Sequence, residues 1–205
     1  MPLLTLNLAG LTFDDACRRL AENGYQRIAE GDWAYVYTSP DAWRVIRITP
    51  YDPAYLLFVY TCWSCPHANL PVHSALIRLA GSGYAVEMPR YTHGDVTLRA
   101  GFIAALQAAM DAPENRSELA ALALTLQSGL VLGQQTVPYF GGIDWNLDNV
   151  LLAGLTPKVV DGFMQNGSVI TDSIDCGAAL TLTPVEIDGF LQIPYYRRGR
   201  KQVGA

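Results

Sequence analysis

Charged side chains are scarce in this chain. Asp, Glu, Lys and Arg make up 16% of its 205 residues, whereas hydrophobic residues make up 50%. So much hydrophobic content excludes a disordered chain, and so little charge excludes a long coiled coil. Acidic residues outnumber basic ones by 19 to 14, and the resulting net charge of −5 argues against nucleic acid as a partner. With so few carboxylates, the position of each one is informative.

Long apolar runs are also lacking. No apolar run approaches the roughly 20 residues that span a bilayer, so we expect no membrane insertion. The segment Met1–Phe13 is fairly apolar, but it has neither a basic start nor a small-residue cleavage site, and it is therefore unlike a signal peptide. We expect an intracellular, cytoplasmic protein whose thiols stay reduced.

Cysteine and histidine are few, with four and three copies. Cys62 and Cys65 form a CxxC motif that His67 and His73 follow, so a zinc site or a redox-active dithiol is one alternative for the function. The other two cysteines supply no second ligand pair at a suitable spacing. We therefore expect the cysteines to act as small buried hydrophobic residues.

The first 91 residues have the patterns of a mostly antiparallel sheet with one inserted helix. Thr12 and Asp15 resemble the start of a helix, and Asn23-Gly24 its end. The expected elements are a helix over 13–23, strands near 25–29 and over 35–37 and 44–48, a helix over 53–64, and a hairpin over 71–88.

Alanine and leucine dominate after Gly94. The expected elements are helices over 98–111 and 115–132 with Pro113 between them, a loop from Gly141, and strands over 149–153, 157–161 and 168–172. Asp161-Gly162 and Asn166-Gly167 are typical of hairpin turns. The basic stretch Arg197–Lys201 is expected to be a solvated tail. The fold class is thus α+β, with a β-rich part over 1–91 and a mainly helical part over 92–205.

The segment 141–152 contains the residues best suited to chemistry. Asp144 lies on a loop before an apolar strand, where its carboxylate can accept a proton from a hydroxyl, and the amide oxygen of Asn149 can bind Mg²⁺. The expected strand over 168–172 ends in Asp172, which would join Asn149 in a site for a hard cation. Alternatively, Asp144 and Asn149 only form turns, as these residue types often do.

The pattern D-x-x-x-x-N-V-L-L, from Asp144 to Leu152, resembles the catalytic loop of the protein-kinase superfamily. Four other segments, in the expected order, resemble further parts of that family. They are Ala29–Val36 (the glycine-rich loop), Val45–Ile48 (the strand with the ATP-binding lysine), His67–Pro71 (the segment before the fourth strand) and Tyr84–Tyr91 (the fifth strand and hinge).

This resemblance implies a protein-kinase-like two-lobe fold with a β-rich N-lobe and a truncated, mainly helical C-lobe, as in small bacterial effector kinases or phage-encoded kinase-like proteins. It implies binding of ATP and Mg²⁺ and a protein substrate or partner. Asp144 and Arg47 would be catalytic, while Asn149 and Asp172, or alternatively Asp161, would hold the metal. We favour Asp172 because Asp161-Gly162 fits a hairpin tip. The residues expected to contact the nucleotide are Ala29, Gly31, Ala34, Val36, Arg47, Met88 and Arg90.

The chain also departs from the kinase pattern. Gly31 is the only glycine kept in the loop over 29–36, and Arg47 replaces the lysine. The helix over 53–64 has no glutamate to pair with Arg47, so we expect that the usual Lys–Glu ion pair cannot form. The stretch after Asp172 is too short for the substrate-docking helices of a full kinase. These departures favour the alternative of a catalytically inactive pseudokinase that acts as a protein-binding module.

Overall fold

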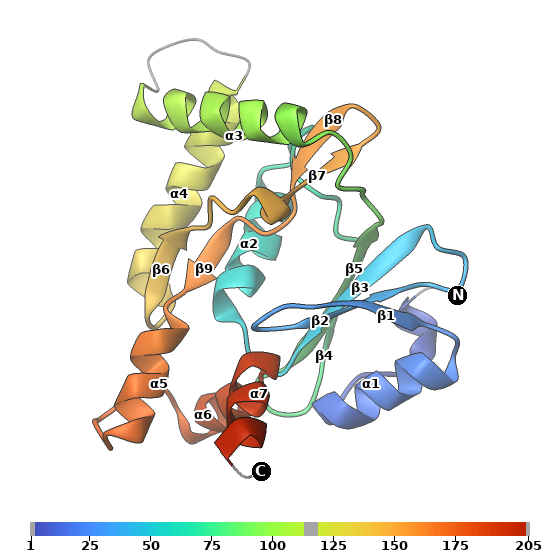
Figure 1. Cartoon of the computed structure of the whole chain (residues 1–205), viewed down its shortest axis with the longest axis vertical. Helices are drawn as coiled ribbons and strands as arrows, with labels where there is room; N and C mark the ends of the chain where they lie inside the picture. The colour runs from blue at the N-terminus through green and yellow to red at the C-terminus, as the bar shows by residue number, and fades with distance from the viewer. Residues whose placement is uncertain (1–2, 113–118, 204–205) are drawn as a thin grey trace. The chain divides into compact units, whose positions relative to one another are not determined.

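The computed structural model describes residues 3–112 and 119–203 and shows a mixed α+β protein (Figure 1). Its chain forms two compact units. The first unit consists of Met1–Asp52, His73–Arg90 and Leu180–Ala205, and the second of Pro53–Val72 and Tyr91–Ala179. These boundaries differ from the expected division near residue 91, because the helix over 53–64 lies in the second unit and the last 26 residues lie in the first.

A five-stranded antiparallel sheet lies at the centre of the first unit. Its strands, in spatial order, are β1 (Gln26–Glu30), β2 (Tyr35–Thr38), β3 (Arg44–Thr49), β5 (Tyr84–Pro89) and β4 (Ala75–Arg78). The expected strands and the expected hairpin are therefore confirmed, with boundaries that differ by a few residues.

Helix α1 (Phe13–Glu22) packs against one face of this sheet (Figure 1). Thr12 caps the helix by accepting a hydrogen bond from the Asp15 amide, which confirms the expected start. The short 3₁₀ helix η1 (Leu3–Leu6) precedes α1. Side chains that alternate along the strands complete the core beneath α1, namely Tyr37, Ile46, Ile48, Ile77 and Ala85.

Two C-terminal helices, α6 (Pro184–Leu191) and α7 (Pro194–Val203), complete the first unit. Phe190 is fully buried, and its ring centroid lies 5.7 Å from that of Trp33 and 5.6 Å from that of Tyr196. Arg197 and Arg198 of the expected solvated tail lie in α7 and form ion pairs with earlier parts of the chain, while the Arg198 side chain stays 44% exposed.

The second unit combines helices with two short two-stranded sheets. The helices are α2 (Pro53–Ser64), α3 (Val96–Asp111), α4 (Ala120–Thr136), α5 (Gly167–Asp175) and the 3₁₀ turn η2 (Leu147–Asn149). β6 (Phe140–Ile143) pairs with β9 (Phe163–Gln165), and β7 (Val150–Ala153) pairs with β8 (Thr156–Val159). The expected helices are confirmed, although Pro113 and residues 115–118 lie outside the described residues. Within the described parts of the chain, no helix has the length and apolarity to cross a bilayer.

Two glycines let α4 approach the β6–β9 strand pair closely. A Cβ at Gly129 would lie 2.4 Å from the ring of Phe163, and one at Gly133 would lie 2.5 Å from the ring of Phe140. Larger residues at these positions would push the helix away from the aromatic rings. Because β6 and β9 are only four and three residues long, packing against α4 stabilises a pairing that their local sequence does not determine.

The expected strand over 168–172 is wrong, because these residues lie in α5. The side-chain oxygen of Asn166 accepts a hydrogen bond from the Val169 amide, so the Asn166-Gly167 pair starts a helix instead of turning a hairpin. Ile170 is the one buried residue of this helix. The apolar residues over 168–172 therefore do not form the row of buried side chains that a core strand would have. The expected strand over 157–161 is β8, which ends at Val159.

His73, which precedes β4, makes the stability of the first unit depend on pH. Burial, together with the positive charge of Arg47, lowers the pKa of His73 to about 4. An unfolded histidine binds its proton near pH 6.5, so between these values the unfolded state holds more protons and acid destabilises the fold. We expect the free energy of unfolding to fall by about 2 kcal/mol between pH 7.5 and 5 through this residue. Urea unfolding of wild type and His73→Asn at both pH values measures the effect, and an equal loss in both proteins would contradict it.

Candidate functional site

Three of the expected nucleotide contacts lie in one row across the sheet of the first unit. Ala29 on β1 is directly opposite Val36 on β2, which is directly opposite Arg47 on β3. Residues directly opposite one another in antiparallel strands have their side chains on the same face. This face is the one turned away from α1, because Tyr37 and Ile46, at the alternate positions, belong to the core beneath that helix.

The remaining expected nucleotide contacts lie around the same face. Met88 is opposite Val45, two residues before Arg47, and it therefore shares the face of Arg47. The turn between β1 and β2 closes through a 2.9 Å hydrogen bond from the Gly31 amide to the Ala34 carbonyl. Arg90 follows β5, where its amide donates to the carbonyl of Trp43.

Arg47 has a carboxylate partner that the sequence analysis missed. Its Nη2 lies 2.5 Å from Oδ2 of Asp52, and the side chains of the two residues are 14% and 5% exposed. Arg47 therefore has an acidic partner, although α2 itself carries no glutamate. Asp52 immediately precedes α2, one residue outside the range over which the sequence predicts a helix. The hydroxyl of Tyr84 also holds this position by donating to the Asp52 carbonyl.

Asp144 and Asn149 lie in a tight loop of the second unit, between β6 and β7. The Asp144 carboxylate accepts a hydrogen bond from the Asn146 amide at 3.0 Å, and the Asn149 amide donates to the Asn146 carbonyl at 3.0 Å. The turn-forming role that we considered for Asp144 is thus real. It also gives the carboxylate a defined position, which a catalytic base needs.

Backbone hydrogen bonds attach this loop to the segment around Asp161. The Asp144 amide donates to the Gly162 carbonyl at 3.1 Å, and the Val160 amide donates to the Asn149 carbonyl at 2.8 Å. Asp161 lies between these two bonded residues, and its Oδ1 atom is buried. Three oxygen-bearing side chains, those of Asp144, Asn149 and Asp161, therefore come from adjoining segments.

The location of Asp172 removes the reason for preferring it as a metal ligand. It lies in the exposed part of α5, not at the end of a strand. Asp161 is not at a hairpin tip either, since β8 pairs with β7 and β9 pairs with β6. Of the two aspartates, Asp161 is the one whose neighbours are bonded to the loop with Asp144 and Asn149.

Arg99 on α3 is a second residue that the sequence analysis missed. Its Nη1 donates to the carbonyls of Leu147 and Val150, at 2.9 and 3.3 Å, and the residue is only 6% exposed. Arg99 therefore fixes the loop that carries Asn149. A lone arginine in an otherwise apolar helix was the available sign in the sequence.

The structure gives no support to a metal or redox role for the cysteine pair. Burial raises the pKa of Cys62 to about 12, which keeps its thiol protonated and unreactive. His67 accepts a hydrogen bond from the Asn69 amide through Nδ1. Within the described residues, no three His, Cys, Asp or Glu side chains are grouped as metal ligands. The candidate cation ligands differ from such a group, because they are the carboxylate of Asp161 and the amide oxygen of Asn149.

Comparison with known proteins identifies no family for this chain. Its sequence matches no protein-family description and no curated protein.

Proposed function

We propose that this chain is a minimal kinase-like protein that binds Mg·ATP and transfers phosphate to a hydroxyl group of a protein. The observation that carries the proposal is the pair of backbone hydrogen bonds that joins the Asp144–Asn149 loop to residues 160–162. They bring a candidate base and two candidate metal ligands together in the order that the kinase resemblance predicts. The proposal includes the two-lobe kinase-like fold, with the sheet of the first unit as the N-lobe.

Each residue has a role in the proposed reaction. The acceptor hydroxyl gives its proton to the Asp144 carboxylate while its oxygen forms a bond to the γ-phosphorus, and the bond from that phosphorus to the bridging oxygen of ADP breaks. Asn149 and Asp161 would hold Mg²⁺, which neutralises charge on the phosphates. Arg47, held by Asp52, would contact the phosphates.

The first unit supports this proposal in a second way. The sheet face that carries Arg47 also carries small or apolar side chains at Ala29, Val36 and Met88, which suit the flat surface of a purine. The turn over 31–34 lies at the end of the same strands. A cation beside an apolar surface is the combination that a nucleoside triphosphate needs.

A thermal-shift titration tests nucleotide binding. Ligand at about 100 times its Kd stabilises a protein by about 2.7 kcal/mol, which corresponds to roughly 5–10 °C in Tm for a chain of this size. We expect such a shift with Mg·ATP in wild type and in Asp172→Asn, and its loss in Asp161→Asn and Asn149→Ala. No shift in wild type at millimolar Mg·ATP would contradict the proposal. A shift that depends on Asp172 instead of Asp161 would restore the first assignment.

A second candidate function is that of a pseudokinase that binds a protein partner without transferring phosphate. Arg47 in place of lysine favours it, and so does a loop with Gly31 as its single retained glycine. Incubation with radiolabelled ATP and a generic protein acceptor separates the candidates. Transfer that disappears in Asp144→Ala supports the enzyme, whereas nucleotide binding without transfer supports the pseudokinase.

A further inference from the structure

Helix α7 holds the turn between β1 and β2 in the first unit. The amide of Tyr195 donates to the Asp32 carbonyl at 3.0 Å. The guanidinium group of Arg198 contacts two carboxylates of this region, with Nη2 2.6 Å from Asp32 and Nη1 3.0 Å from Glu30. Trp33, next in the turn, packs on Phe190 of α6. Backbone, charge and aromatic contacts thus attach one short turn to the C-terminal helices.

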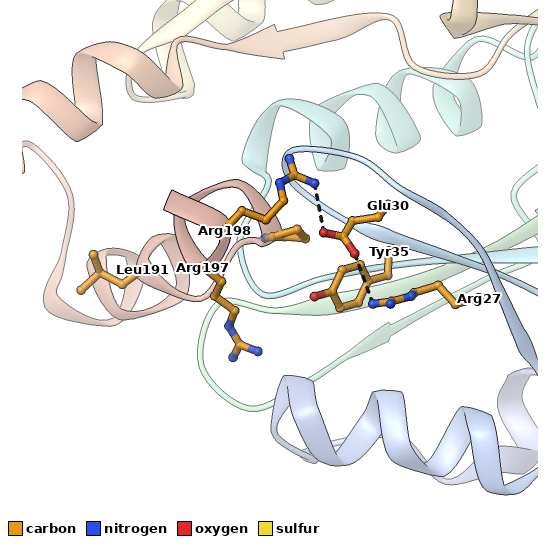
Figure 2. A pocket seen from close by; sticks show the side chains of 7 residues that line it. Arg27, Glu30, Tyr35, Leu191, Arg197 and Arg198 are labelled. Carbon is orange, nitrogen blue, oxygen red and sulfur yellow. Dashed lines mark hydrogen bonds and ion pairs between the residues drawn. The ribbon is translucent and has the colours of Figure 1, made fainter. Parts of the chain in front are cut away.

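A cavity of about 420 Å³ lies beside this contact. Figure 2 shows Glu30 between Arg198 and Arg27, which form ion pairs with it at 3.0 and 3.3 Å. The cavity is lined by Arg27, Glu30, Tyr35, Leu191, Pro194, Arg197 and Arg198.

Although it is rich in arginine, this cavity has no excess positive charge. Its three guanidinium groups are matched by three carboxylates, those of Asp14, Glu30 and Asp32, at distances between 2.6 and 3.3 Å. An anion would have to displace these partners to bind. The ion pairs are therefore better understood as connections between α7 and the rest of the unit than as a site for a ligand.

The position of Arg198 gives these connections a functional meaning. Glu30 is directly opposite Tyr35, whose side chain packs against the core beneath α1. Arg198 therefore contacts the turn from the side of the sheet on which α1 lies. Its ion pairs do not cover the opposite face, which carries Ala29, Val36 and Arg47. Without Arg198, Asp32 would lose its ion pair and Glu30 would keep only Arg27, beside a turn proposed to cover phosphates.

We propose that Arg198 is a positioning residue for the nucleotide loop. It pairs with both Glu30 and Asp32 and, together with Arg27, offsets their negative charge, and it holds the turn over 31–34 in place so that the turn can lie near phosphate groups. This inference rests on the proposed function, because it assigns a role in Mg·ATP binding. It makes the C-terminal helix part of the nucleotide site without any contact to the nucleotide.

The anchoring role is tested without nucleotide, on the full-length chain. Hydrogen exchange of the amides over 31–34 is expected to be about three- to tenfold faster in Arg198→Gln than in wild type. The matched control is Arg197→Gln, which removes the same charge from the same helix but breaks a pair with Asp14 on α1. Unchanged exchange in Arg198→Gln, or an equal increase in both variants, would overturn the anchoring role.

Calorimetric titration with a non-hydrolysable Mg·ATP analogue tests the role in binding. We expect Arg198→Gln to weaken binding about three- to tenfold, Arg197→Gln to weaken it less, and the second change Asp32→Asn to restore most of the loss. Equal affinity of wild type and Arg198→Gln, or no recovery with Asp32→Asn, would overturn the proposal. If wild type binds no analogue but exchange at 31–34 rises in Arg198→Gln, the proposed function fails while the anchoring remains.

Discussion

Replacement of Asp52 by asparagine is expected to lower the free energy of unfolding by about 3–5 kcal/mol. Asp52 is 4% exposed, and its carboxylate pairs with the largely buried Arg47. Burying a charge is costly, and the pair is stable only because each ion compensates the other. The variant leaves the largely buried Arg47 guanidinium without its opposite charge, which costs more than the loss of one hydrogen bond.

Urea unfolding followed by circular dichroism measures this loss. The control is Glu22→Gln, a similar neutral replacement in the exposed ion pair with Arg19, for which we expect less than about 1 kcal/mol. The double variant Arg47→Met/Asp52→Leu is expected to recover most of the stability, because apolar residues of similar size need no compensation. Similar stabilities for Asp52→Asn and Glu22→Gln would show that the Arg47–Asp52 ion pair is effectively solvated.

Phe58→Ala is expected to destabilise the second unit by about 3–5 kcal/mol. The ring of Phe58 is fully buried in α2, with its centroid 5.8 Å from that of Phe163. It also lies against Gly162, where a Cβ would come within 2.6 Å of its Cε2 atom. Removal of the ring leaves a cavity beside Gly162, and the neighbouring Asp161 loses the packing that fixes its backbone.

Denaturant unfolding measures this loss, with Trp63→Ala as the control on the same helix. Trp63 is 41% exposed, so we expect a smaller effect from it than from Phe58→Ala. We also expect Phe58→Ala to weaken any Mg·ATP shift at temperatures where the protein remains folded. If the two variants have equal stability, the contact between α2 and the 162–163 segment is not a core contact.

Local patterns were sufficient wherever a short segment determines its own structure. Thr12 and Asp15 predicted the start of α1, because a helix cap depends on residues three apart. The same reasoning failed at Asn166-Gly167, since this pair is compatible with both a hairpin turn and a helix start. The β6–β9 pairing joins residues about 20 apart and depends on packing against α4, so no local pattern could predict it.

The candidate site shows the same limit. Asp144 and Asn149 were found because their spacing lies within one loop. Asp52 and Arg99 were not found, because one precedes a helix by a single residue and the other contacts a loop almost 50 residues away. The choice between Asp161 and Asp172 depended on strand pairing, which only the fold reveals.

The division of the first unit between both ends of the chain has a consequence for biosynthesis. The ribosome makes the sheet and α1 first, but Phe190 and α7, which pack on Trp33 and Asp32, are made more than 150 residues later. By then the second unit, which ends at Ala179, has already been translated in full. We therefore expect the second unit to fold first during translation. The N-terminal sheet is expected to become fully stable only later, when α6 and α7 pack against it and close a long loop in the chain.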